Sequence, residues 1–172
     1  MSSAACQRRI PTFREHLEVL QQSLVAVAQE SFFSFAELCG PERFGETVAA
    51  AEAEASGSAL RWLRSRVEFE GAFAGVVSVT MPHALALELM MGVAGLSPED
   101  EIPEGLVIDA IGEFANMVCG RWLTRAAVHR KFDLQPPAVS SAEAPTERRL
   151  DGELLSLIND KPVSVRVDFV SS

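Results

Sequence analysis

The chain contains few cysteines and lacks any apolar run long enough to span a membrane. Its three cysteines, Cys6, Cys39 and Cys119, are odd in number, far apart in the sequence and without CxxC spacing. This usage indicates neither a disulfide framework nor a zinc site. A membrane-spanning helix needs roughly 20 consecutive apolar residues, whereas the most hydrophobic stretch, residues 84–96, is interrupted by Glu88.

Basic residues are also scarce. Lys and Arg total 15 against 24 Asp and Glu, which gives a formal net charge of -9. Binding to nucleic acid or to an anionic membrane surface depends on a basic face. No such cluster occurs in the sequence, so we expect neither partner. The first residues also lack the basic segment and apolar stretch of a secretory signal, and the cytoplasm is therefore the expected compartment.

The familiar nucleophilic and metal-binding arrangements are missing as well. The sequence offers no convincing Ser-His-Asp or Cys-His arrangement and no phosphate-binding P-loop. His16, His83 and His129 are scattered over separate predicted elements, without carboxylates or cysteines at ligand spacing. We therefore expect this chain to bind no metal and no cofactor of its own.

A length of 172 residues, 48% of them hydrophobic, is that of one ordinary domain. We expect residues 1–12 to form an N-terminal tail and residues 13–172 a single domain, in which residues 140–160 form a polar loop or insertion. The remaining patterns predict, in order, a helix over 13–38, a possible helix over 47–55, a strand pair over 60–81 turning near 70–72, helices over 82–93 and from 103 or 104 to about 128, and strands over 131–134 and 161–170. This order predicts an α+β fold with long helices packed on a mostly antiparallel sheet.

A narrow polar stripe runs along the predicted helix that begins near residue 103. At 100° per residue, Asp109, Glu113, Asn116 and Gly120 fall within an arc of about 60°, and apolar residues fill the broad opposite side. A glycine such as Gly120 costs roughly 1 kcal/mol relative to alanine inside a helix. That cost is tolerated more readily if something must approach the stripe closely.

Two residues of the stripe are suited to chemistry. Glu113 supplies a negative charge, and Asn116 supplies a carboxamide that can donate to one group and accept from another. Because a rigid helix holds both side chains on neighbouring turns, the pair can position a water molecule or a partner's cation. The alternative interpretation is that the stripe is the ordinary solvated face of a helix, since exposed helix faces are normally polar.

The same residues resemble a known protein family, the CheC and CheX phosphatases of chemotaxis-type response regulators. The family's D/S-x-x-x-E-x-x-N motif on a long helix is matched by Asp109, Glu113 and Asn116, followed by Gly120. The preceding strand pair is similar too, with F-E-G-x-x-x-G over residues 69–75 and then VSVTMP. After the motif helix, the segment KFDLQPPAV resembles a strand of the family that ends in P-x-V.

The resemblance implies a CheC/CheX-like fold and a phosphatase that hydrolyses the aspartyl-phosphate of a receiver domain. Asn116 would orient the attacking water, and Glu113 would pair with the receiver's lysine. Asp109 and Gly120 would contact the partner, which would also hold the magnesium ion. The first predicted helix has no E-x-x-N, so one site per chain indicates the CheX-like branch, whose members pair as homodimers through their sheets.

Two other functions stay open at this point. The chain could bind a receiver, or act as a dimeric signalling adaptor, without catalysing turnover. It could also be a small-molecule binding domain, which requires Glu113 and Asn116 to lie in a closed polar pocket rather than on an open helix face. A net charge of -9 gives no general attraction toward an acid-rich receiver site.

Overall fold

The computed structural model of the protein describes residues 13–54, 61–146 and 152–170. The predicted tail, residues 1–12, lies outside the described residues. The helices are α1 (Phe13–Phe32), α2 (Pro41–Glu54), α3 (His83–Ala94) and α4 (Glu104–Ala126). The strands are β1 (Ala36–Leu38), β2 (Trp62–Gly71), β3 (Gly75–Pro82), β4 (Phe132–Leu134), β5 (Ala138–Ala142), β6 (Glu153–Ile158) and β7 (Lys161–Phe169).

All strand pairs of the described sheet are antiparallel, in the order β1-β6-β7-β3-β2-β4. β5 also pairs with β2, alongside residues 62–66, while β4 pairs alongside residues 69–71. β4 and β5 therefore share the outer edge of β2. Helices on an antiparallel sheet make an α+β fold, which confirms the predicted class.

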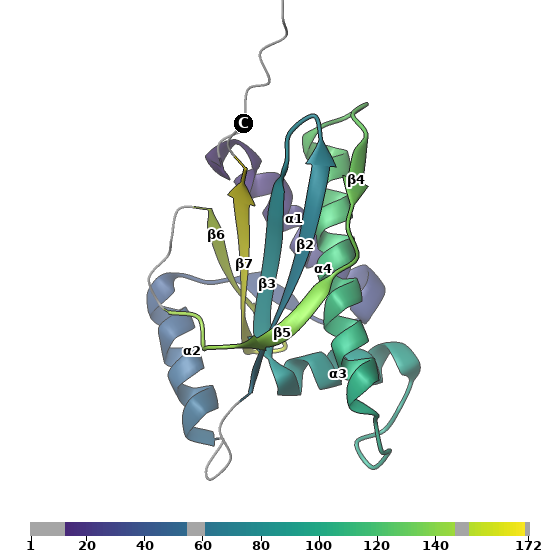
Figure 1. Ribbon diagram of the computed structural model, residues 1–172. Coiled ribbons are helices and arrows are strands. Elements are labelled where there is room, and N and C mark those ends of the chain that lie inside the picture. The colour runs from purple at the N-terminus through teal and green to yellow at the C-terminus, as the bar shows by residue number, and fades with distance from the viewer. Residues whose placement is uncertain (1–12, 55–60, 147–151, 171–172) are drawn as a thin grey trace, which may run out of the picture.

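The helices cover the two faces of the sheet unequally. In Figure 1, α1, α3 and α4 form a layer behind the sheet, whereas α2 lies apart from them. Alternation along the strands explains this arrangement, because successive side chains point to opposite faces. Leu63 and Leu154 belong to the main core, while their neighbours Trp62 and Leu155 pack with Phe44 of α2 in a second, smaller cluster.

α4 is the central helix of the main core. Its predicted apolar side is confirmed, since residues from Val107 to Leu123 on that side are buried. Phe114 meets Phe32 of α1 in an edge-to-face contact with ring centroids 5.2 Å apart. Further along, Trp122 is fully buried among aromatic rings. This packing holds the helix that carries the polar stripe against the sheet.

The prediction of one helix over residues 13–38 is wrong at its C-terminal end, because α1 stops at Phe32 and β1 follows. Phe33 adopts a left-handed backbone conformation, with a φ of 51°. The Ser34 N–H then donates to the Ala28 carbonyl oxygen at 2.9 Å, a pattern typical of helix C-caps. Aromatic residues continue past this point, so the apolar pattern alone does not reveal the helix end.

The prediction of a polar loop or insertion over residues 140–160 is also wrong for much of the described part of that range, while residues 147–151 lie outside the described residues. The first residues of the range belong to β5, and β6 fills most of its second half. All six residues of β6 are buried, so this strand lacks the polar–apolar alternation by which a half-exposed strand is found. Asn159 and Asp160, both with positive φ, form the two-residue turn between β6 and β7.

The other predicted elements are confirmed with small shifts at their ends. The predicted strand pair is β2 and β3, which turn at residues 72–74. The possible helix over 47–55 is the second part of α2, which begins earlier, at Pro41. Proline is favoured at the first position of a helix because its missing N–H has no intrahelical partner there in any case.

Candidate functional site

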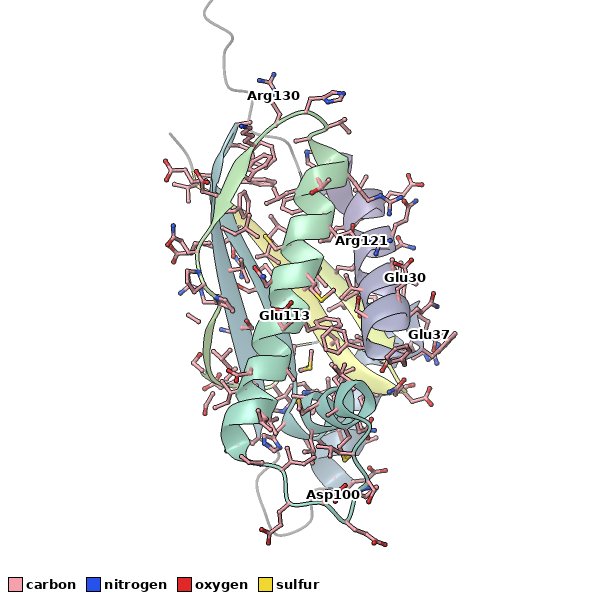
Figure 2. The ribbon with its side chains drawn as sticks, turned by 90° about the vertical axis from the view of Figure 1, so that its right-hand side faces the viewer. Glu30, Glu37, Asp100, Glu113, Arg121 and Arg130 are labelled. Atoms are coloured by element: carbon pink, nitrogen blue, oxygen red, sulfur yellow. The ribbon has the colours of Figure 1, made fainter. Side chains whose placement is uncertain are left out.

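The polar stripe predicted on α4 lies on the outer side of that helix. Asp109 and Glu113 are exposed, and Asn116 and Gly120 are partly exposed. Figure 2 shows Glu113 midway along α4, with α1 on one side and the β4–β5 segment on the other. Since a helix rises about 1.5 Å per residue, Glu113 and Asn116 are about 4.5 Å apart along the axis. All four predicted site residues therefore share one accessible face.

The polar side chains of the stripe are available to another molecule. Asp109, Glu113 and Asn116 make no hydrogen bond or ion pair with any other residue that the structure describes. Asp109 and Glu113 lie one turn apart with the same charge, an arrangement that destabilises a helix by about 0.2–0.5 kcal/mol. A cation brought by a partner would relieve this repulsion.

An ion pair fixes α4 to α1 beyond the stripe. Nη1 of Arg121 lies 2.6 Å from Oε2 of Glu30, and Nη2 lies 3.2 Å from Oε1. The hydrogen bond from Arg121, with the charges of Arg121 and Arg125, holds the pKa of Glu30 below its ordinary value of 4.5. The guanidinium group of Arg121 is therefore paired with Glu30 and does not neutralise the carboxylates of Asp109 and Glu113.

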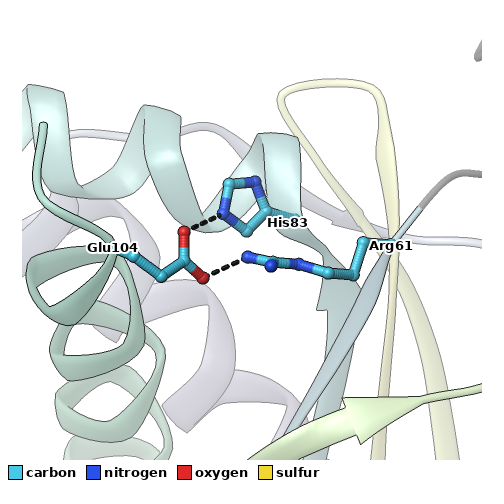
Figure 3. Close-up of polar contacts among 3 residues, drawn as sticks. All are labelled: Arg61, His83 and Glu104. Atoms are coloured by element: carbon cyan, nitrogen blue, oxygen red, sulfur yellow. Dashed lines mark hydrogen bonds and ion pairs between the residues drawn. The ribbon is translucent and has the colours of Figure 1, made fainter. Parts of the chain in front are cut away.

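A second polar contact fixes the first turn of α4. Figure 3 shows the Glu104 carboxylate between His83 of α3 and Arg61, which precedes β2. His83 Nε2 lies 2.9 Å from Oε2 of Glu104, and Arg61 donates to Oε1. The hydrogen bonds of His83 and Arg61 and their nearby charges lower the pKa of Glu104. Exposed ion pairs stabilise a protein little individually. Together, however, the Glu30–Arg121 contact and the contacts of Glu104 connect α4 with α1, with α3 and with the residue that precedes β2.

Gly112, rather than Gly120, is the glycine of α4 that is packed tightly within the chain. A Cβ added at Gly112 would lie 3.2 Å from Cγ of Pro137 and 3.7 Å from Cγ2 of Val139. A Cβ at Gly120 would meet only Cδ2 of Leu134, at 4.0 Å, an ordinary contact distance. Gly120 therefore leaves open surface beside the stripe. The stripe pattern singled out Gly120 but not Gly112, and only the packing of Pro137 and Val139 against α4 distinguishes the two glycines.

An apolar groove opens beside the stripe, between α1, α3 and α4. Its volume is about 470 Å³. We call it the α1–α3–α4 groove, and it is lined by Ser31, Phe32, Met90, Val93, Leu106, Asp109, Ala110, Glu113 and Met117. Of these lining residues, only Asp109 and Glu113 are ionisable. The sequence pattern did not predict the groove, because its walls come from three separate helices whose packing a pattern within one element does not show.

His16 and Cys119, which lie outside the stripe, are packed against other side chains of the protein. The ring of His16 stacks on Phe73 at 6.2 Å and meets Trp122 edge-on at 5.8 Å. Burial raises the pKa of the Cys119 thiol to about 12, which leaves it protonated and unsuited to nucleophilic attack. Within residues 13–54, 61–146 and 152–170, no three His, Cys, Asp or Glu form a group able to hold a metal ion. No described helix is long and apolar enough to cross a membrane.

Solved structures of chemotaxis proteins share this fold. CheX from Vibrio vulnificus is 21% identical, with 94% of this chain and 100% of that chain covered at a TM-score of 0.64. A putative chemotaxis protein from Desulfovibrio vulgaris Hildenborough is 18% identical over 91% and 97% of the two chains, with a TM-score of 0.62. CheX from Desulfovibrio desulfuricans is 13% identical over 91% and 99%, also with a TM-score of 0.62.

The sequence itself carries the family assignment. A comparison with curated proteins finds no significant match. The family model of the chemotaxis phosphatase CheX, however, matches residues 64–155. This range is more than half of the chain and includes β2 from its third residue, all of β3 and the whole of α4 with its polar stripe. The chain therefore belongs to the CheX family of chemotaxis phosphatases.

Proposed function

We propose that this protein hydrolyses the aspartyl-phosphate of a CheY-like response-regulator receiver domain, with Glu113 and Asn116 acting on the receiver's active site. The observation that carries the proposal is the open placement of these two side chains on neighbouring turns of α4, without partners among the described residues. Family membership supports it. The same open placement disfavours a closed small-molecule pocket.

In the proposed reaction, a water oxygen attacks the phosphorus atom in line with the bond to the receiver's aspartate. The bond from phosphorus to water forms while the P–O bond to aspartate breaks, and the carboxylate leaves with the electron pair. The water gives up a proton to the solvent or to the phosphate. The products are the receiver with its aspartate side chain unphosphorylated, and inorganic phosphate. Asn116 orients the water, because its carboxamide oxygen accepts a hydrogen bond and its amide group donates one.

Such a reaction makes few demands on this chain. Phosphoryl transfer depends mainly on positioning and on electrostatic stabilisation, so no nucleophile from the chain is needed. Glu113 pairs with the receiver's lysine and thereby sets the depth at which α4 enters the site. Magnesium, which neutralises phosphoryl charge, would be held by the receiver. Asp109 and Gly120 would contact the receiver on either side of the Glu113–Asn116 pair.

We also propose that the active form is a homodimer paired through the sheet, as the family resemblance implies. Sedimentation velocity of the full chain measures this directly. A species of twice the mass of 18.6 kDa is expected at micromolar concentration. A monomer throughout that range would contradict the proposal without affecting the assignment of Glu113 and Asn116.

The test of the enzyme is the loss of phosphate from receiver domains that have been phosphorylated with acetyl phosphate and magnesium. Three proteins are compared: the wild type, Asn116→Ala, and Glu46→Gln as a control on α2. We expect the wild type and the control to accelerate hydrolysis and Asn116→Ala to leave the receiver close to its own rate. If the wild type accelerates hydrolysis in no receiver, the proposed catalytic activity is wrong. Binding of a phosphorylated receiver without acceleration would instead identify an adaptor.

A further inference from the structure

We infer that the α1–α3–α4 groove is the second half of the docking site and receives an apolar side chain that the receiver carries beside its lysine. The inference rests on the proposed function and adds to it a determinant of partner choice. In this arrangement Glu113 recognises the cation, and the groove recognises the apolar surface next to that cation.

The composition of the groove supports this division. Its walls are apolar apart from Ser31 and the two stripe carboxylates. Val93 is 51% exposed and Leu106 is 39% exposed, so apolar surface is left in contact with water on both the α3 side and the α4 side. Contiguous exposed apolar surface is a feature of interaction sites. A partner that covers the groove would remove this surface from water.

The position of Glu113 links the groove to the proposed catalytic stripe. Asp109 and Glu113 belong both to the stripe and to the groove lining, so a cation that pairs with Glu113 brings its own neighbours onto the groove. No lysine, arginine or histidine lines the groove among the described residues. The charge of the site therefore complements a partner that is cationic and apolar at adjacent positions.

An exposed aromatic residue follows α1 in the chain, next to the groove residue Phe32. Phe33 directly follows groove residue Phe32 and is 77% exposed. Phe33 has a left-handed backbone conformation. Two residues later, the Phe35 N–H donates a hydrogen bond to Oδ1 of Asn159 at 3.0 Å. The Asn159 amide also donates to Oγ of Ser34 at 3.3 Å. The turn is therefore held in place before any partner binds.

Charge favours a receiver over a second copy of this chain as the occupant. In a two-fold interface the same patch meets itself, so Asp109 and Glu113 of one copy would face the same carboxylates of the other. Like charges across an interface are costly. A receiver that presents a lysine meets no such repulsion.

The experiment compares Val93→Ser/Leu106→Ser with Val128→Ser. Val128 is 62% exposed and lies after α4, outside the groove. The probes are receiver domains phosphorylated with acetyl phosphate for turnover, and the same domains loaded with beryllium fluoride and magnesium for Kd. Removing two partly exposed apolar side chains from a contact is expected to raise KM and Kd by about tenfold, with kcat within about twofold of the wild type. Val128→Ser should match the wild type in every measurement.

The outcomes separate this inference from the proposed function. Unchanged KM and Kd in the double variant, with normal wild-type turnover, overturn the groove inference alone. Weakened binding of a receiver that the wild type binds but does not hydrolyse upholds the groove and overturns the enzyme. Absence of both binding and turnover in the wild type overturns both. A shift of the double variant from dimer to monomer in sedimentation velocity assigns the groove to a second copy and overturns the receiver as occupant.

Discussion

Glu30 of α1 accepts hydrogen bonds from both terminal nitrogens of Arg121 on α4, and this ion pair links two of the three helices that form the groove. Because Arg121 lowers the pKa of Glu30, the pair contributes stability above the unfolded-state pKa and loses it as the pH falls through the lower, folded-state pKa. We therefore expect Glu30→Gln to be less stable than the wild type near neutral pH. The difference should shrink as the pH falls below 4.5.

Urea unfolding of the wild type and Glu30→Gln at a series of pH values measures this difference. Glu46→Gln is the matched control, since Glu46 is exposed on α2 and makes no ion pair with another described residue. A difference for Glu30→Gln that grows as the solution becomes more acidic would contradict the role given to the pair.

The contact between Phe114 and Phe32 predicts a large effect on folding. Phe114 is fully buried on the side of α4 opposite the stripe, so truncation leaves a cavity in the main core. We expect Phe114→Ala to lower the free energy of unfolding by about 3–5 kcal/mol. Phe35→Ala, at an exposed position, should change it by less than about 0.5 kcal/mol. Chemical denaturation followed by circular dichroism compares the two, and equal effects would contradict the burial assigned to Phe114.

The two glycines of α4 should respond differently to alanine. At Gly120 there is room for a Cβ, so Gly120→Ala should stabilise the helix by up to about 1 kcal/mol. At Gly112 the new Cβ would crowd Pro137, and the gain should be smaller or reversed. Melting temperatures of the two variants test this order. If a receiver approaches Gly120 closely, Gly120→Ala should also raise KM despite its greater stability, whereas an unchanged KM would remove Gly120 from the contact surface.

The separate roles of Asn116 and Glu113 predict separate kinetic effects. Loss of water orientation in Asn116→Ala should lower kcat by about 10²-fold with KM little changed. Loss of the charged partner in Glu113→Gln should raise KM by roughly tenfold or more, because hydrogen bonds to charged groups are strong. Steady-state hydrolysis of a phosphorylated receiver measures both, beside Glu46→Gln as a control. If both variants change KM alone, neither residue acts on the attacking water.

The burial of Cys119 and Cys39 predicts how fast each thiol reacts with an alkylating reagent. Cys119 is fully buried and its pKa is raised to about 12, so it should resist iodoacetamide at pH 8 in the native protein. Burial also raises the pKa of the partly exposed Cys39, which should react, but more slowly than a free thiol. Mass spectrometry of native and urea-unfolded samples locates the modified residues. Rapid modification of Cys119 in the native protein would contradict its burial.

Local spacing determined much of the site. A helix repeats every 3.6 residues, so the positions of Asp109, Glu113 and Asn116 place them on one side of α4, and the apolar residues between them place the other side in the core. Alternation in β2, β3 and β7 similarly predicts strands with one buried face. These features are legible because each depends on the order of residues within a single element.

Contacts between distant segments decided the rest. α1 ends at Phe32 where a cap forms and where Asn159, far along the chain, bonds to the turn. β6 has no alternation because it is buried throughout. The groove exists only where α1, α3 and α4 meet. The periodicity of apolar residues indicates which side of a helix or strand turns away from water. Which other segment packs against that side depends on contacts between distant residues, and a linear pattern does not contain those contacts.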